Sequence, residues 1–212
     1  MLLALGIFAV LGYLLGSVNF AVLVSKRYGV DILKEGSGNP GATNVKRVLG
    51  KGPGNLVFAL DALKGAAGTY LPFLLADAVS PGAPRFELLA AGFVGTLLGH
   101  CFSCFLKFKG GKGVASTIGG LLVLLPIPIV IGAALWALAF YTTRYVSVAS
   151  LALGLSLPLS CWLLPKFFSS LQLGTAQLIF AGAIALFNVW THRSNIGRLL
   201  RGEENKFTKK AS

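Results

Sequence analysis

Residues 114–141 read VASTIGGLLVLLPIPIVIGAALWALAFY, an apolar stretch that is long for one membrane-spanning helix and short for two. Pro126 and Pro128 lie in its middle. Because proline lacks a backbone donor and disfavours helix in the residue before it, the stretch is predicted to break into two helices. The side of the membrane on which every later loop lies depends on this break.

The whole chain has the composition of an integral membrane protein. Hydrophobic residues make up 55% of its 212 residues, charged residues make up 12%, and the mean hydropathy is +0.75. A soluble domain of this length would carry more polar groups on its surface. Lysine and arginine number 19 against 7 aspartates and glutamates, which fits positively charged cytoplasmic loops and equally an anionic substrate.

Further apolar stretches cover residues 1–24, 53–75, 86–105, 146–164 and 173–190, and most have the length of a spanning helix. The first stretch carries no charge and lacks the basic leading region and cleavage site of a signal peptide. We therefore expect it to be a retained first helix.

The distribution of charge decides how many helices cross the membrane. With a break at the prolines, all basic residues except Lys64, Arg85 and Lys166 fall in segments on the same side of the membrane. Without the break, Arg144 and the basic tail move to the outer face, against the positive-inside tendency. We predict an all-α integral membrane protein with seven transmembrane helices, its N-terminus outside and its C-terminus cytoplasmic. Residues 1–212 are expected to form one domain, with cytoplasmic motif loops at about residues 25–52, 106–113, 142–150 and 191–212.

The first of these loops has the chemistry of a phosphate site. Gly36, Gly38 and Gly41 free the backbone to turn N–H groups toward an anion, while polar side chains and Arg47 add hydrogen bonds and charge. The same glycines form a literal G-x-G-x-x-G. A dinucleotide site would also need a preceding strand and a soluble βαβ unit, which the apolar context argues against.

Asp61 stands at the distance expected of a ribose-binding acid but falls inside an apolar stretch. Lys64 follows it by one helical turn, so we expect an i, i+3 ion pair that neutralises both side chains within the membrane.

A second motif, FKGGKG at residues 108–113, leads directly into a predicted helix. Glycines admit an anion, the helix start supplies N–H groups, and Lys112 adds charge, although the spacing is not that of a Walker A loop. The alternative interpretation is a flexible basic turn beside anionic headgroups.

A third motif begins where the last apolar stretch ends. His192 and Asn195 share a helical face, and Arg193, Arg198 and Arg201 offer further anion contacts. The alternative is a headgroup-binding anchor.

The other histidine, His100, ends a predicted helix and is either a site-facing group or a structural one bonded to a neighbouring helix. The adjacent C-x-x-C of Cys101 and Cys104 has no second pair and is interpreted as incidental.

Together these motifs resemble, in order and spacing, the bacterial acyl-phosphate:glycerol-3-phosphate acyltransferase family, over nearly the whole chain. The matching segments are residues 16–20, 36–47, 61–65, 99–113, 144–150 and 192–200. The resemblance implies a seven-helix enzyme of the bacterial inner membrane with its site facing the cytoplasm. It also implies acyl transfer from acyl phosphate to the 1-hydroxyl of sn-glycerol 3-phosphate, which gives lysophosphatidic acid and phosphate as the first acylation step of phospholipid biosynthesis.

By this resemblance, the family's functional positions are occupied by Ser37, Arg47, Lys112, Ser150, His192 and Asn195. The phosphate-binding loops correspond to Gly38, Asn39, Pro40, Gly41, Ala42, Thr43 and Asn44, and to Gly110, Gly111 and Gly113. Acyl phosphate is already an activated mixed anhydride, so positioning and charge neutralisation can carry most of the rate without a covalent acyl-enzyme. Either His192 or a substrate phosphate would accept the proton of the attacking hydroxyl.

The chain departs from the family pattern at Asn19, Ser103, Cys104 and Ser194, where Pro, Pro, Val and Glu are usual. No cofactor is implied, and two isolated histidines with few carboxylates indicate no metal site. The implied partners are both substrates, membrane lipids and, functionally, an enzyme that supplies acyl phosphate. Two other classes stay open at this point, a transporter of an anionic solute and a non-catalytic lipid-binding module.

Overall fold

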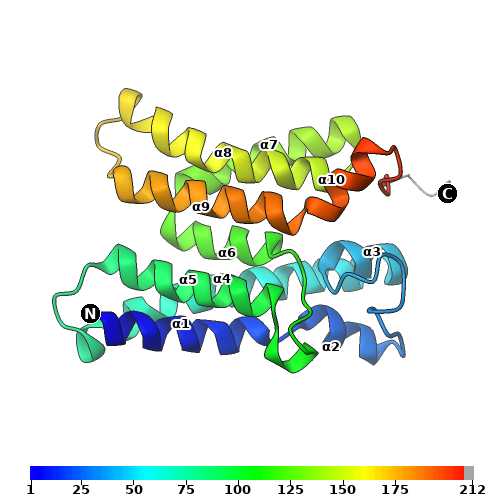
Figure 1. The fold of residues 1–212 in the computed structure, drawn as a ribbon, viewed down its shortest axis with the longest axis horizontal. Coiled ribbons are helices and arrows are strands. Elements are labelled where there is room, and N and C mark those ends of the chain that lie inside the picture. The colour runs from blue at the N-terminus through cyan, green and yellow to red at the C-terminus, as the bar shows by residue number, and fades with distance from the viewer. Residues whose placement is uncertain (208–212) are drawn as a thin grey trace. The chain divides into compact units, whose positions relative to one another are not determined.

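The structure is a computed structural model that describes residues 1–207, which form ten α-helices, one 3₁₀ turn and no strand (Figure 1). The all-helical fold expected from the apolar stretches is confirmed. In chain order the elements are α1 Leu2–Ser17, α2 Phe20–Arg27, α3 Ala42–Leu49, α4 Lys51–Val79, α5 Arg85–Cys101, η1 Cys104–Leu106, α6 Val114–Leu124, α7 Pro126–Thr143, α8 Val146–Phe167, α9 Thr175–Thr191 and α10 Arg193–Leu200. Lys209 and Lys210 of the predicted basic tail lie outside the described residues.

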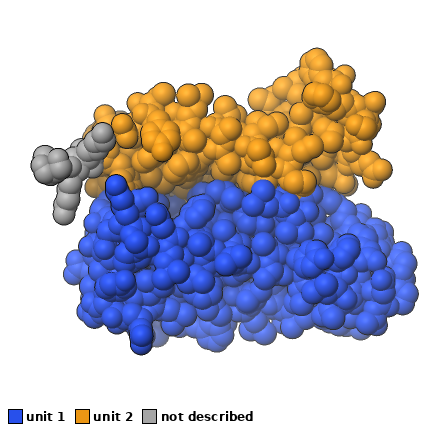
Figure 2. Space-filling view, turned by 180° about the vertical axis from the view of Figure 1, so that it is seen from behind, with its two compact units in different colours: residues 1–124 blue, residues 125–212 orange. Residues whose placement is uncertain are grey.

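The chain divides into two compact units, Met1–Leu124 (unit 1) and Leu125–Ser212 (unit 2), which Figure 2 colours separately. The boundary coincides with the predicted proline break. Leu125 caps α7 and Pro126 occupies its first turn, where a missing N–H costs nothing because first-turn amides have no helical acceptor. Residues 114–141 therefore form two helices, as the proline pair predicts.

Within residues 1–207, four helical stretches are long and apolar enough to cross a membrane. They are Leu2–Arg27, Arg85–Leu106, Pro126–Thr143 and Val146–Phe167, and the shorter apolar helices are Val114–Leu124 and Thr175–Thr191. Many large apolar side chains face outward, among them Leu3, Val10 and Leu186. An extensive apolar exterior of this kind fits hydrocarbon better than water.

The retained first helix expected over residues 1–24 corresponds to one candidate membrane span, Leu2–Arg27, and the structure shows that this span is interrupted between α1 and α2. The Asn19 side chain caps α2 by accepting a hydrogen bond from the Val22 N–H at 3.0 Å. Distant side chains satisfy the carbonyls that the break exposes: Ser103 Oγ donates to the Ser17 carbonyl at 2.6 Å, and Lys64 Nζ donates to the Val18 carbonyl at 2.7 Å. Two of the departures from the family pattern, Asn19 and Ser103, thus support the same break.

Glycines bring the helices of unit 1 into backbone contact. A Cβ at Gly99 of α5 would collide with the Tyr13 carbonyl of α1, and one at Gly65 of α4 would collide with the Ser116 carbonyl of α6. A Cβ at Gly119 of α6 would likewise meet the Ala62 carbonyl of α4. Small residues allow this close approach in membrane helices. The polar segments at the ends of α1, α4, α5 and α6 are therefore carried by a tightly packed scaffold.

In unit 2, α8 packs against both α7 and α9, and α10 follows α9. The loop expected over residues 142–150 is much shorter than predicted. Arg144 ends α7 in the left-handed conformation and α8 begins at Val146, so Ser150 lies on a helix rather than in a turn. The alanine and serine content of this segment is compatible with helix, and only the turn at Arg144 and Tyr145 interrupts it.

Candidate functional site

The first glycine loop of unit 1 is held by one side chain from the helix that follows it. Asn44, in the first turn of α3, accepts a hydrogen bond from the Ser37 N–H at 2.9 Å and donates to the Glu35 carbonyl at 2.9 Å. Gly36 and Gly38 adopt positive φ angles of 59° and 67°. Asn44 is fully buried, so it shapes the loop from within, while the Ser37 side chain is exposed.

The start of α3 completes this side of the site. Gly41 is its N-cap, and Ala42 and Thr43 form its first turn, whose N–H groups have no acceptor within a helix. A helix N-terminus of this kind attracts anions. Arg47 lies on the same helix, in an exposed position.

The second glycine loop, residues 107–113, connects η1 to α6. Its Gly111 N–H donates to the His100 carbonyl at 3.1 Å, which ties the loop back onto the end of α5. A Cβ at the preceding residue, Gly110, would collide with that same carbonyl, so this hydrogen bond requires a glycine at position 110. Lys112 is half-buried directly before the N-terminus of α6.

The structure brings the two predicted phosphate loops of unit 1 together at Pro40 and Gly111. A Cβ built on Gly111 would lie 3.2 Å from the Pro40 carbonyl oxygen. That carbonyl also accepts a hydrogen bond from Asn19 Nδ2 at 3.4 Å. Two glycine-rich segments that are about 70 residues apart in the sequence therefore line one place, and each leads into a helix N-terminus.

A buried polar cluster lies next to the second loop. Lys64 Nζ is 2.9 Å from Asp61 Oδ1, which confirms the ion pair predicted at i, i+3. His100 Nδ1 lies 3.6 Å from the same oxygen and 3.3 Å from Ser116 Oγ. Buried charges are stable only when they are paired, so these contacts explain how Asp61 and Lys64 are accommodated in an apolar helix bundle.

Unit 2 holds the remaining predicted residues, and Asn188 of α9 connects two of them. The side-chain Nδ2 of Asn188 donates to the Ser150 carbonyl at 3.2 Å, and the main-chain carbonyl oxygen of Asn188 lies 2.9 Å from His192 Nδ1. Ser150 Oγ donates to the Val146 carbonyl at 2.8 Å and lies 3.4 Å from Trp136 Nε1. Ser150 and His192 are both buried and both anchored to the backbone.

The hydrogen bonds of His192 select its tautomer. A carbonyl can only accept, so Nδ1 must carry the proton that it donates to the Asn188 carbonyl. In the neutral ring this places the lone pair on Nε2, the arrangement that a general base requires.

Asn195 shares the first turns of α10 with His192, its N-cap, and makes a different set of contacts. Its Nδ2 donates to Glu204 Oε1 at 2.6 Å, and Arg198 Nε donates to Glu204 Oε2 at 2.7 Å. Burial would by itself raise the pKa of Glu204, but the hydrogen bonds from Asn195 and Arg198 outweigh it and hold that pKa below its usual value. The segment after α10 is thus folded back onto the helix by a charged carboxylate.

Sequence reasoning missed Asn188 and Glu204. A signal for Asn188 was present, since an asparagine inside an apolar helix is unusual and it precedes His192 by four residues, one helical turn. Glu204 is an acidic residue in a basic tail, but only the fold-back of the chain shows which groups it pairs with.

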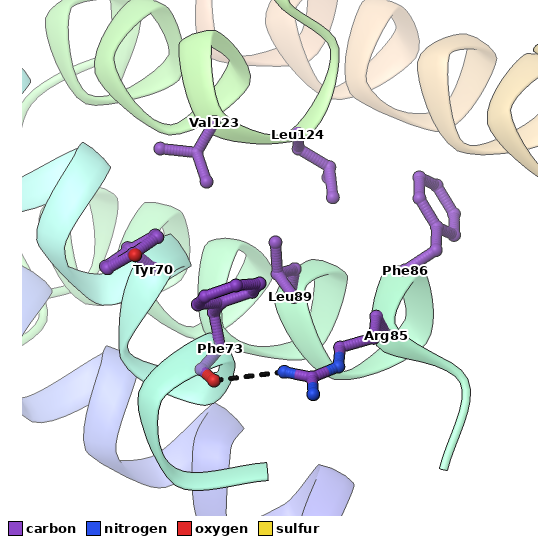
Figure 3. Close-up of a pocket in the computed structure, with 7 residues that line it drawn as sticks. All are labelled: Tyr70, Phe73, Arg85, Phe86, Leu89, Val123 and Leu124. Carbon is purple, nitrogen blue, oxygen red and sulfur yellow. Dashed lines mark hydrogen bonds between the residues drawn. The ribbon is translucent and has the colours of Figure 1, made fainter. Parts of the chain in front are cut away.

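A separate pocket of about 570 Å³ lies among α4, α5 and α6 and is lined by Tyr70, Phe73, Arg85, Phe86, Leu89, Val123 and Leu124 (Figure 3). Arg85 donates to the Phe73 carbonyl at 3.1 Å and pairs with Asp77 at 3.1 Å. The lining of this pocket contains none of the predicted site residues. The pocket lies at the C-terminal end of α6, whereas the second glycine loop precedes the N-terminal end of that helix. Over residues 1–207, no three His, Cys, Asp or Glu side chains gather as a metal site.

Known proteins resemble this chain over almost its full length. The sequence profile described as "Glycerol-3-phosphate acyltransferase" matches residues 6–202. Relatives named glycerol-3-phosphate acyltransferase include one from Shouchella clausii, 40% identical over 94% of each chain, and one from Desulfotalea psychrophila, 41% identical over 96% of this chain and 98% of the other.

Solved structures agree with the sequence comparisons. The crystal structure of PlsY (YgiH), an integral membrane glycerol 3-phosphate acyltransferase, is similar in its glycerol 3-phosphate form with a TM-score of 0.81, 36% identity and 96% of each chain covered. Its lysophosphatidic acid form is similar with a TM-score of 0.80 and 36% identity, over 96% of this chain and 95% of the other.

Proposed function

The chain belongs to the glycerol-3-phosphate acyltransferase family, and we propose that it transfers a fatty acyl group from acyl phosphate to the 1-hydroxyl of sn-glycerol 3-phosphate. The products are lysophosphatidic acid and inorganic phosphate. The observation that carries this proposal is the meeting of two glycine loops at Pro40 and Gly111 in unit 1. Both substrates bear phosphate, and each loop supplies backbone N–H groups at a helix start together with a nearby cation.

In unit 1 we assign phosphate binding to the two loops. Backbone amides near Gly38 to Thr43, except that of Pro40, which has no N–H, bind the acyl phosphate and stabilise the oxyanion that develops on its carbonyl, and Ser37 adds a hydroxyl. Lys112 and Arg47 neutralise substrate phosphate. Asn44 contributes by holding the loop, since its side chain bonds to the loop backbone.

In unit 2 we assign orientation of the acceptor to Ser150 and Asn195. His192 orients the attacking hydroxyl or accepts its proton through Nε2, a role that a substrate phosphate would otherwise fill. The hydroxyl oxygen forms the new ester bond to the acyl carbon, and the bond from that carbon to the phosphate oxygen breaks. Phosphate leaves with the electron pair, and the hydroxyl proton passes to the base. No covalent acyl-enzyme is needed, because the donor is already activated.

We assign the protein to the bacterial inner membrane as a seven-span chain over one domain of residues 1–212, with its N-terminus outside and its motif loops cytoplasmic. The charge asymmetry of the loops supports this orientation. An acyl phosphate-producing enzyme is its functional partner. Reporter fusions at each terminus measure the orientation, and cytoplasmic reporter activity at the N-terminus would contradict it.

The reaction is tested with purified protein in detergent or bilayers. Acyl phosphate and glycerol 3-phosphate are expected to yield equal amounts of phosphate and lysophosphatidic acid, whereas an acyl thioester donor is expected to yield neither. Acyl-labelled donor without acceptor should leave no label on the denatured protein. Turnover of the thioester would overturn the donor assignment, and a labelled chain would overturn direct transfer.

Lys112→Ala tests the phosphate contact, and Lys109→Ala in the same loop is the matched control. Loss of a charge-assisted phosphate contact is expected to lower kcat/KM by about a hundredfold, equivalent to roughly 2 to 3 kcal/mol. Lys109 is exposed, and its variant should stay near wild-type activity. Equal activities of the two variants would refute the role of Lys112.

A further inference from the structure

His100 is buried at the end of α5, and its ring contacts elements on two sides. It belongs to none of the groups to which a role has been assigned so far. We propose that His100 is a positioning residue that holds residues 110–113 of the second glycine loop in the conformation that binds substrate phosphate. The inference rests on the proposed function, because it deepens the account of how that loop works.

On one side, the Nδ1 edge of the ring is fixed by side chains from two other helices. Asp61 Oδ1 of α4 lies 3.6 Å from Nδ1, and Ser116 Oγ of α6 lies 3.3 Å from it. Asp61 is itself held by Lys64 at 2.9 Å, and Lys64 donates to the Val18 carbonyl at 2.7 Å. These linked contacts leave the imidazole little freedom to rotate.

On the other side, Nε2 faces the loop. A Cβ on Gly111 would collide with His100 Nε2, so the ring lies directly against the backbone of this residue. The Gly111 N–H also donates to the His100 carbonyl at 3.1 Å. The ring and the main-chain carbonyl of His100 therefore both fix the position of Gly111, which immediately precedes Lys112.

This placement couples the two phosphate loops. The Pro40 carbonyl of the first loop lies 3.2 Å from the Cβ position of Gly111, so this carbonyl and the His100 ring both lie beside the same position on Gly111. If the ring is removed, the loop loses its support and is expected to shift toward the vacated space. Displacing a positioned group by about 1 Å can lower enzyme efficiency by up to about a hundredfold. The effect should appear in binding of a phosphate-bearing substrate rather than in folding.

The test compares two neighbouring glycines in two backgrounds. Gly111→Ala directs its new methyl group at the His100 ring, whereas Gly110→Ala directs it at the backbone carbonyls of His100 and Cys101. His100→Ala removes the first obstacle and leaves the second. We expect His100→Ala and Gly111→Ala each to raise the KM of at least one substrate by about tenfold, with kcat changed less than threefold.

In the His100→Ala background, Gly111→Ala should add less than a twofold further loss, because the collision with the ring is gone and the tightest remaining contact of the methyl group is the Pro40 carbonyl at 3.2 Å. Gly110→Ala should cost the same factor in both backgrounds. Additive losses for Gly111→Ala, or an unchanged KM in folded His100→Ala protein, would overturn the proposal.

Ser116→Ala provides a second route if His100→Ala protein does not fold. It removes one contact to Nδ1 and should raise the same KM a few fold while the melting temperature stays near that of the wild type. An unchanged KM in this variant would also count against the proposal. A wild-type protein that fails to acylate glycerol 3-phosphate contradicts the proposed function instead, so the two failures are distinguishable.

Discussion

The buried ion pair between Asp61 and Lys64 allows a prediction about stability that separates charge pairing from packing. Their side chains are 3% and 2% exposed, and Lys64 Nζ lies 2.9 Å from Asp61 Oδ1. Removing one partner of a buried pair leaves an uncompensated charge and typically costs about 3 to 5 kcal/mol. We expect Lys64→Met to lower the free energy of unfolding by this amount, because it strands Asp61.

The double variant Asp61→Asn, Lys64→Met leaves no buried charge. Its main remaining cost is the Val18 carbonyl, which loses the donor now provided by Lys64 at 2.7 Å. An unsatisfied buried acceptor costs about 1 to 3 kcal/mol, so the double variant should be more stable than Lys64→Met alone.

Reversible unfolding in detergent or bicelles, followed by helical circular dichroism, provides the measurement. The exposed pair of Arg85 and Asp77 is the matched control, since its side chains are 46% and 78% exposed and its charged atoms lie 3.1 Å apart, a separation close to that of the buried pair. Asp77→Asn should change the free energy of unfolding by less than about 1 kcal/mol. The reasoning is refuted if Lys64→Met lowers the free energy of unfolding no more than this control does. It is also refuted if the double variant lowers that free energy by as much as the sum of the single variants Lys64→Met and Asp61→Asn.

Three further outcomes are expected. Glu204→Gln should weaken the packing of the segment after α10 against that helix by about 1 to 3 kcal/mol of free energy, measured as increased protease cleavage of the segment at neutral pH. Because the folded-state pKa of Glu204 is lowered, its stabilisation is present above the ordinary value of 4.5 and is lost as the pH falls through the folded-state value; wild-type cleavage should therefore rise on acidification while the variant's changes little. Gly119→Ala should impair folding because its Cβ meets the Ala62 backbone, whereas Gly182→Ala, with open space around it, should be neutral or slightly stabilising in a thermal melt. Asn19→Ala removes the cap of α2 and should cost about 1 kcal/mol in the same assay, and an unchanged melting temperature would contradict the capping role.

Several features of this protein could be predicted from its sequence because they depend on residues that are close along the chain. The helical membrane class follows from composition and the length of apolar stretches, and the break before α7 follows from Pro126. The pairing of Asp61 with Lys64 follows from their spacing of one helical turn. The glycine loops were recognisable because an anion site built from backbone N–H groups is a local property of glycine and a helix start.

The features that only the tertiary structure decided all involve contacts between distant segments. Whether residues 1–24 form one helix or two depended on Ser103 and Lys64, which satisfy the carbonyls at the break. The place of His100 depended on Asp61, Ser116 and Gly111, which lie on three other elements. Hydropathy and spacing describe the neighbours along one helix, whereas these side chains are held by partners that come near only when α1, α4, α5 and α6 pack through glycine contacts. Local pattern therefore determined which segments are helices and which can bind phosphate, and packing determined which buried polar groups support them.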